Sequence, residues 1–226
     1  MLQVVEKFVS INGEGTNAGR IAAFLRFAGC NLNCSFCDTR WANEENAAFQ
    51  EETSHQLAEY VRVQGVRFVT LTGGEPLLQK DIIELTKELL DIEGLTIEFE
   101  TNGSMPLEEL DRLRTECDQQ ERVLFTMDYK LPGSGMQKAM RTENFSLLKK
   151  KDTVKFVAGS IEDLDTMKQV VKTYGLGETC HVYVSPVFGR IEPSAIVDYI
   201  IEEQLHEVTM QLQMHKFIWD PDKRGV

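Results

Sequence analysis

Hydrophobic positions in this chain form short apolar runs separated by longer amphipathic stretches. Runs rich in β-branched and aromatic residues predict strands at 21–27, 66–71, 95–100, 123–127, 153–157, 181–184 and 208–212, and residues 1–9 predict a first strand. Helical periodicity marks 53–63, 81–90, 107–114, 161–174 and 193–204. Repeated strand–helix units predict an α/β fold with a mostly parallel sheet, either open or curled into a full or partial barrel.

Local signals support two of the helix starts and a simple domain organisation. Thr53 followed by Gln56 resembles a capping box, and Ser160 with Asp163 indicates another helix N-terminus. No long linker, low-complexity segment or internal repeat interrupts the pattern. We therefore expect one domain over residues 1–226.

Composition and charge exclude several classes of partner. A hydrophobic content of 42% over 226 residues is enough for a sizeable core, and the longest apolar runs are too short to span a bilayer. The formal charge of −12 disfavours a nucleic-acid partner, because that affinity depends on neutralising phosphates. The first strand contains Glu6 and Lys7 and has no positive leader, so we expect a soluble cytoplasmic protein.

Polar residues and glycines follow the predicted strands. They occupy residues 30–39, 72–76, 100–103, 128–130 and 185–186. Because active sites of parallel α/β proteins lie at the carboxyl ends of the strands, we expect these segments to meet at one rim.

Three cysteines within eight residues carry the main chemical signal. Cys30, Cys34 and Cys37 stand in the run CNLNCSFC, a spacing that can bring three thiolates to zinc or to an iron–sulfur cluster. A structural zinc site needs a further ligand pair, and Cys117, Cys180 and the histidines form none. A disulfide framework is disfavoured by five cysteines without a secretory segment. Three thiolates suit a four-iron cluster that keeps one iron open, but spacing alone leaves zinc possible.

A glycine-rich strand end narrows this choice. Together with the cysteine run, Gly73-Gly74-Glu75-Pro76 resembles the radical S-adenosylmethionine (SAM) superfamily. The resemblance implies a [4Fe–4S] cluster on the three cysteines, with the open iron chelating SAM. The backbone around Gly73, Gly74 and Glu75 would accept the methionyl ammonium, glycine leaving room for its approach, and Phe36 would lie near the adenine. An external one-electron donor such as flavodoxin would reduce the cluster, and SAM cleavage would give a 5′-deoxyadenosyl radical.

Further motifs reach both termini. They are FVSINGEG at 8–15, FLRFAGC at 24–30, Asp38-Thr39, QMHK at 213–216 and KRGV at 223–226. Together they resemble the 7-carboxy-7-deazaguanine synthase (QueE) family, which contracts the ring of 6-carboxy-5,6,7,8-tetrahydropterin and releases ammonia. This resemblance implies a partial, modified (β/α) barrel, a homodimer and Mg²⁺ bound by Thr39.

The same resemblance implies roles for other residues but identifies no general acid or base. Asn12 stands where the family commonly has Gln, and Asp128-Tyr129 replaces Ser-Pro before Lys130. The implied substrate contacts are Ile11, Asn12, Gly13, Glu14, Arg26, Thr72, His215 and Val226. The implied SAM contacts are Phe36, Gly73, Gly74, Glu75, Asp128, Tyr129, Lys130, Ser185, Pro186, Val187 and Phe188.

Two other functions compete with this interpretation. A glycyl-radical activating enzyme has the same cysteine spacing, but it needs an open groove for a protein loop. A non-catalytic zinc-binding module would hold metal without iron or radical chemistry.

Overall fold

One mixed sheet organises the part of the chain that the structure, a computed structural model, describes: residues 1–44, 46–117, 119, 121–221 and 223–226. Within these residues nine strands pair in the order β3-β1-β2-β4-β5-β6-β7-β8-β9. β1 is antiparallel to β2 and β3, and every neighbouring pair from β2 to β9 is parallel. The strands are β1 (Leu2–Ile11), β2 (Ile21–Phe27), β3 (Gln50–Glu52), β4 (Phe68–Gly73), β5 (Thr96–Thr101), β6 (Val123–Tyr129), β7 (Thr153–Ala158), β8 (His181–Pro186) and β9 (Val208–Met210).

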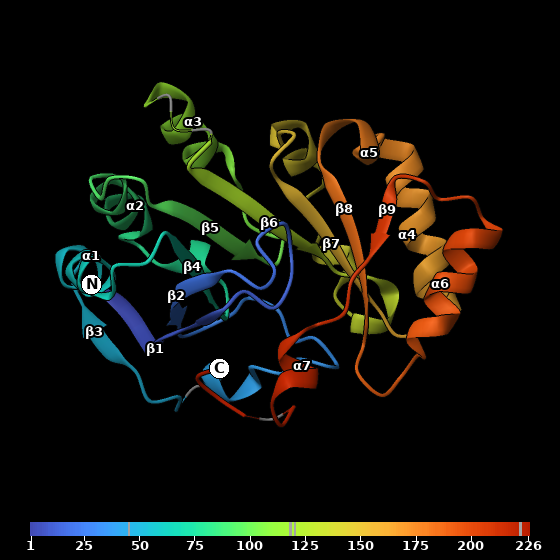
Figure 1. The fold of residues 1–226 in the computed structure, drawn as a ribbon, viewed down its shortest axis with the longest axis horizontal. Coiled ribbons are helices and arrows are strands. Elements are labelled where there is room, and N and C mark those ends of the chain that lie inside the picture. The colour runs from blue at the N-terminus through green and yellow to red at the C-terminus, as the bar shows by residue number, and fades with distance from the viewer. Residues whose placement is uncertain (45, 118, 120, 222) are drawn as a thin grey trace.

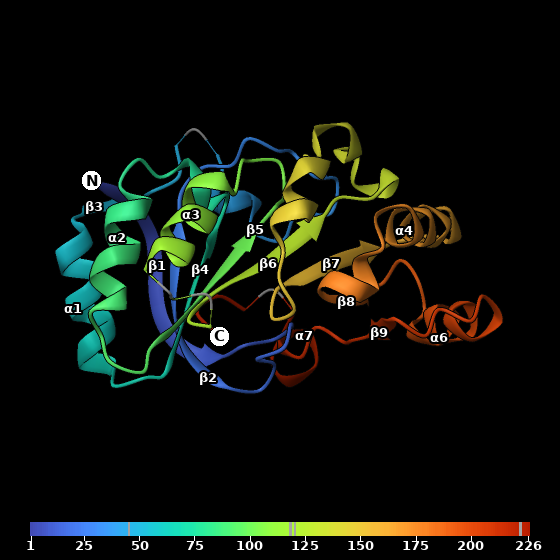
Figure 2. The ribbon, with the colours of Figure 1, turned by 90° about the horizontal axis from the view of Figure 1, so that it is seen from above.

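Helices surround the outer face of this curved sheet. Figure 1 shows α1, α2 and α3 outside the first half of the sheet and α4 and α6 outside the second, and Figure 2 shows the same arrangement from above. The open side of the sheet holds α7 and the C-terminus (Figure 1). The helices are α1 (Ser54–Gln64), α2 (Ile82–Leu90), α3 (Glu108–Glu116), α4 (Ile161–Tyr174), α5 (Leu176–Thr179), α6 (Pro193–Glu202) and α7 (His215–Ile218). Short 3-10 helices span Arg40–Ala42, Pro76–Leu78, Pro132–Ser134, Gln137–Ala139 and Thr142–Leu147.

The predicted helix starts form as expected. Thr53 accepts a hydrogen bond from the backbone of Gln56, whose side chain accepts from the backbone of Thr53, so α1 begins with a complete capping box. Ser160 accepts from the backbone of Asp163 at the start of α4. Apolar side chains of these helices pack against the sheet, where Phe99 and Phe125 are fully buried.

The sequence-based prediction of a mostly parallel α/β sheet is confirmed. The sheet does not close, because β3 and β9 pair on one side only, so a complete barrel is excluded within the described residues. The pattern misses β3, α5 and α7, which are too short to show a period. No helix among the described residues has the length and hydrophobicity to cross a bilayer.

Candidate active site

A cavity of about 800 Å³ lies at the carboxyl ends of the parallel strands. Strands β2 and β4 to β7 contribute side chains, mostly from their C-terminal halves, and the C-terminal segment also lines the cavity. This arrangement brings together residues that are far apart in the sequence. The predicted residues that line the cavity are Ile11, Gly13, Glu14, Arg26, Cys30, Cys34, Phe36, Cys37, Thr39, Thr72, Gly73, Gly74, Asp128, Lys130, Val187, Phe188, His215 and Val226.

Five predicted residues do not line this cavity. Ser185 reaches it indirectly, because its hydroxyl donates to Glu14 Oε1 at 3.0 Å. The ring of Tyr129 packs against Phe145 and Phe156 in the core. All five are buried: Asn12, Glu75, Tyr129, Ser185 and Pro186.

The cysteine loop follows β2 and is held against the 3-10 helix Pro132–Ser134. The backbone N–H of Ser35 donates to Ser134 O at 3.0 Å, and the Ser35 hydroxyl donates to Gly133 O at 2.8 Å. Arg40 donates to the carbonyl of Cys34 at 3.0 Å. The loop is therefore fixed at its tip, and its three thiols form one wall of the cavity.

Hydrogen-bond donors approach two of the three sulfurs. Asn102 Nδ2 lies 3.5 Å from Cys30 Sγ, and Asn43 Nδ2 lies 3.9 Å from Cys37 Sγ. Burial raises the pKa of Cys30 and of Cys34, so a bound metal would have to displace the thiol protons. Three free thiols, two of which have N–H donors nearby, fit a three-cysteine iron–sulfur cluster.

The two glycines at the end of β4, Gly73 within the strand and Gly74 after it, are required by close backbone packing. A Cβ on Gly73 would collide with the backbone of Phe27, and one on Gly74 would collide with the carbonyl of Gly29. The amide of Gly74 donates to Phe27 O at 3.0 Å. We expected glycine here to leave room for a ligand, whereas the structure shows that the neighbouring β2 segment already occupies the space a Cβ would need.

Glu14 and Lys155 form a buried ion pair that also lines the cavity. Lys155 Nζ lies 2.8 Å from Glu14 Oε2, and Gln213 Nε2 donates to the same oxygen at 3.2 Å. Burial lowers the pKa of Lys155, but Glu14 and Asp128 outweigh this effect and hold it above its usual value. Glu14 is thus a fixed carboxylate that faces the cavity.

Asp128 and Lys130 lie on alternate positions at the end of β6. Lys130 Nζ contacts Asp128 Oδ2 at 2.8 Å, and Lys155 lies 3.8 Å from the same oxygen. Burial opposes ionisation of Asp128, but the two lysines outweigh it and hold its pKa below the usual value. Asp128 Oδ1 is buried without a hydrogen-bond partner in the described part of the chain. A ligand hydroxyl or amine in the cavity would satisfy this acceptor.

Strands β2 and β4 place a cation and a hydroxyl beside the glutamates. Arg26 Nε donates to Glu6 Oε1 at 2.7 Å, which leaves the two Nη groups outside that bond. Thr72 donates to Glu100 Oε2 at 2.8 Å. Both pairs line the cavity and can present donors and acceptors to one polar ligand.

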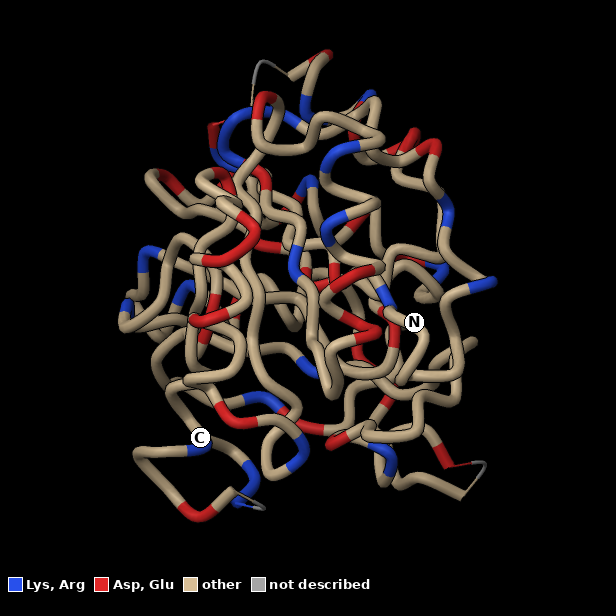
Figure 3. The backbone as a smooth tube through the Cα atoms, turned by 90° about the vertical axis from the view of Figure 1, so that its right-hand side faces the viewer, with Lys and Arg blue, Asp and Glu red and all other residues tan. Residues whose placement is uncertain are grey.

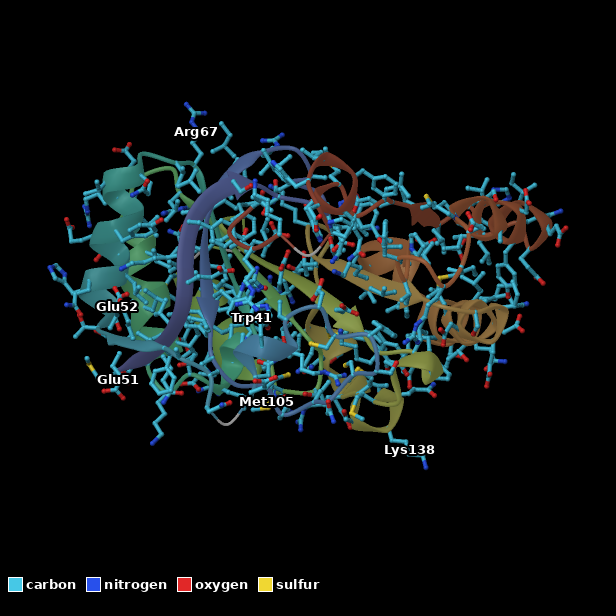
Figure 4. The ribbon with its side chains drawn as sticks, turned by 90° about the horizontal axis from the view of Figure 1, so that it is seen from below. Trp41, Glu51, Glu52, Arg67, Met105 and Lys138 are labelled. Carbon is cyan, nitrogen blue, oxygen red and sulfur yellow. The ribbon has the colours of Figure 1, made fainter. Side chains whose placement is uncertain are left out.

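The C-terminal segment closes the open side of the sheet. The amide of Met214 donates to Gly13 O at 3.1 Å, and Arg224 stacks on the ring of Trp41 at 4.0 Å. Figure 4 shows Trp41 near the middle of the molecule when it is seen from below. Figure 3 shows Lys and Arg positions along the C-terminal segment. Burial holds the pKa of His215 below its usual value. His215 therefore tends to be neutral at the cavity wall.

Several cavity residues were not identified from the sequence. Glu100, Thr101 and Asn102 belong to a polar segment noted after a predicted strand, and that position was their only local signal. Gln213 belongs to the QMHK motif and Leu32 to the cysteine run, but neither was given a role, and the others come from different elements and have no motif that connects them. The missed residues that line the cavity and contact predicted ones are Glu6, Leu32, Asn43, Glu100, Thr101, Asn102, Lys155, Arg190 and Gln213.

Known proteins show similarity over the whole chain. The family model described as the radical SAM superfamily matches residues 25–146. A 7-carboxy-7-deazaguanine synthase from Clostridium acetobutylicum is 49% identical over 224 residues, covering 99% of both chains. The synthase from Chlorobaculum tepidum is 34% identical over 229 residues, covering 100% of this chain and 97% of the relative. QueE from Escherichia coli has the same fold, with a TM-score of 0.68, 22% identity and 93% coverage of each chain.

Proposed function

The chain belongs to the 7-carboxy-7-deazaguanine synthase family of radical SAM enzymes, and from this we propose that it converts 6-carboxy-5,6,7,8-tetrahydropterin to 7-carboxy-7-deazaguanine with release of ammonia. One observation carries the proposal for this site. The three cysteine thiols and a fixed set of carboxylates, lysines and an arginine face the same cavity of about 800 Å³. A volume of this size suits a small molecule beside a cofactor.

The cofactor side of the cavity is the wall that carries the cysteine loop. Cys30, Cys34 and Cys37 would hold the [4Fe–4S] cluster. With SAM bound to it, the reduced cluster would supply the electron that cleaves SAM to the 5′-deoxyadenosyl radical, which removes a hydrogen atom from the substrate. An ammonium donates hydrogen bonds, so the carbonyls around Gly73 and Gly74 are the groups suited to accept from it. The amides of Gly74 and Glu75 instead donate to the carbonyls of Phe27 and Gly29.

Other cofactor contacts would come from the later strands. The unpartnered Oδ1 of Asp128 suits a hydroxyl or amine of SAM, and Lys130 fixes the other carboxylate oxygen. Phe36 and Phe188 contribute apolar surface to the cavity. Tyr129, Ser185 and Pro186 would support this wall from β6 and β8, and Val187, which follows β8, would line it.

The substrate side would be the wall that carries Glu14. Its carboxylate suits the amino-pyrimidine edge of a pterin, and its three donors hold it in place. Arg26 can direct its Nη groups, which do not take part in the bond to Glu6, to the anionic carboxylate of the substrate. Thr72 and His215 would border the ring, together with backbone groups of residues 11–13 and the terminal Val226.

Thr39 is the proposed protein ligand for Mg²⁺. Its hydroxyl lies 3.6 Å from Cys37 Sγ and donates to Gly73 O at 3.3 Å, next to the cofactor wall. Mg²⁺ takes oxygen ligands and retains several waters, so one hydroxyl with substrate oxygens is sufficient. Thr39→Ala is expected to lower turnover at least tenfold at saturating Mg²⁺ while iron content stays unchanged.

The remaining expectations concern the whole protein. All five cysteines are free, which supports a reducing compartment, and we propose the cytoplasm. The continuous sheet and core support one domain over residues 1–226. A homodimer and an external one-electron donor such as flavodoxin follow from the family resemblance.

The decisive experiment is a defined anaerobic assay. Protein reconstituted with iron and sulfide is incubated with SAM, dithionite, Mg²⁺ and 6-carboxy-5,6,7,8-tetrahydropterin, and products are identified by mass spectrometry. We expect 7-carboxy-7-deazaguanine, and no product from a Cys34→Ala variant. Cleavage of SAM by the wild type without this product would contradict the substrate assignment but retain the radical chemistry.

A further inference from the structure

The side-chain amide of Asn102 faces the cysteine loop from the end of β5. Asn102 is 7% exposed, and its Nδ2 lies 3.5 Å from Cys30 Sγ. The same nitrogen lies 3.1 Å from the Oδ1 of Asn31, the next residue in the loop. Because an amide nitrogen carries two hydrogens, it can donate to both partners.

Neighbouring groups determine which end of the Asn102 amide faces the sulfur. Its Oδ1 accepts from the backbone N–H of Ser104 at 2.9 Å and lies 2.6 Å from the Ser104 hydroxyl. A backbone N–H can only donate, so the oxygen of the amide must face Ser104. The NH₂ group is therefore directed to Cys30.

The position of Asn102 is itself fixed by the buried carboxyl group of Glu75. The backbone N–H of Asn102 donates to Glu75 Oε2 at 2.7 Å, and the Thr101 hydroxyl donates to Oε1 at 2.8 Å. The amide of Leu77 donates to Oε1 at 3.1 Å. Glu75 thus connects the glycine-rich end of β4 to the end of β5, and it holds the donor in place before any cofactor binds.

We propose that Asn102 is a positioning residue for the iron–sulfur cluster: it donates an N–H···S hydrogen bond to the Cys30 thiolate and raises the reduction potential. The inference rests on the proposed function, because it requires the cluster. Reduction transfers one electron from the external donor to the cluster and breaks no bond. The reduced form carries one more negative charge, so a donor to a ligating sulfur stabilises it more than the oxidised form.

Asn43 makes a similar but weaker contact with another cysteine of the loop. Its Nδ2 lies 3.9 Å from Cys37 Sγ, and its Oδ1 is buried without a hydrogen-bond partner in the described residues. No donor comparable to Ser104 fixes the orientation of this amide in that part of the chain. The Asn102 contact is shorter and better oriented, so we assign the larger effect to Asn102.

Asn102→Leu tests the proposal because it removes the donor and nearly keeps the side-chain volume. Wild type and variant are reconstituted anaerobically, iron and sulfide are quantified, and the potential is measured by titration monitored by electron paramagnetic resonance. We expect the reduction equilibrium to shift about tenfold toward the oxidised form, which is about 59 mV for one electron. The matched control is Asn33→Leu, at an exposed loop position, which should leave the potential unchanged.

If the leucine variant does not load iron, Asn102→Asp replaces it in the titration. Aspartate can still accept from Ser104 but places a carboxylate oxygen near the sulfur, so its potential should also fall. A potential equal to that of the wild type, in whichever variant loads, would overturn the proposal.

A measurement on the wild type makes the test independent of variant folding. Protein labelled with ¹⁵N-asparagine is reduced and examined by pulsed electron paramagnetic resonance. We expect a ¹⁵N coupling that Asn33→Leu retains and that the Asn102 variant loses, and its absence from the wild type would overturn the inference. A wild type that assembles no cluster would refute the proposed function, whereas normal turnover without this coupling would refute only the role of Asn102.

Discussion

At the scale of single residues, the site depends on charges that are buried and paired. Lys155 is the clearest example, because it is 8% exposed and contacts both Glu14 and Asp128. Removing one member of a buried ion pair leaves the other charge buried without compensation. The resulting loss of stability is usually larger than the stabilisation that the pair provides. Lys155 therefore stabilises the fold and also fixes the two carboxylates proposed to contact substrate and cofactor.

Lys155→Met is expected to lower the free energy of unfolding by about 3 kcal/mol. It would also raise the pKa of Asp128, because one of the two lysines that lower it is lost. Urea denaturation measures the first effect. The double variant with Glu14→Gln should recover part of the loss, and equal stability of Lys155→Met and wild type would contradict the expectation.

Glu98 predicts a dependence of stability on pH. It is 2% exposed, accepts from Thr126 and Asn17, and burial followed by the charge of Glu100 raises its pKa to about 7. The unfolded state loses this proton near pH 4.3, so between about pH 4.3 and 7 the folded state binds more protons. The free energy of unfolding therefore falls as the pH rises through this window and is level above it.

Glu98→Gln should reduce this decline by about 2 kcal/mol between pH 5 and 8. Glutamine can accept from Asn17 and donate to the Thr126 hydroxyl, so both hydrogen bonds are retained. Denaturation of cluster-free protein at a series of pH values measures the slope, with Glu109→Gln on the exposed side of α3 as control. Part of the slope should remain, because burial also raises the pKa of Glu75 to about 7. An unchanged slope in Glu98→Gln would contradict the assignment.

At the scale of elements, strong periodicity made the framework predictable. Strand β2 and helix α4 match their predicted ranges, because β2 is a short apolar run and apolar residues recur along α4 at helical spacing. Strand β3 has the polar sequence Gln50-Glu51-Glu52 and forms only by pairing with β1, so the pattern missed it. The cysteine loop was predictable because its chemistry is local in sequence. Lys155 was not, because its partners come from other elements of the fold.

The C-terminal segment yields a prediction at this scale. Arg224 stacks on Trp41, and a cation–π contact of this kind contributes about 0.5–2 kcal/mol. Arg224→Ala should weaken closure of the cavity and raise the KM for the pterin about 3- to 10-fold, with the melting temperature unchanged. Steady-state kinetics measure this effect, and Arg62→Ala on the exposed face of α1 is the control. Equal KM values for Arg224→Ala and wild type would show that the segment does not contribute to binding.

At the scale of the whole molecule, the hydrophobic core is separate from the cysteine loop, so we expect its folding not to depend on a bound metal. The buried hydrophobic cluster runs from Leu2 to Val208 and includes none of the three predicted cluster ligands. Chelation of the metal should therefore leave the far-ultraviolet circular dichroism and cooperative unfolding intact, and new proteolytic cleavage should be confined to the segment around Cys30–Cys37. A zinc module behaves differently, because its metal supplies the folding free energy and its removal unfolds the chain. Limited proteolysis with mass spectrometry, before and after chelation, distinguishes the two cases, and global unfolding of the chelated protein would contradict an independent core.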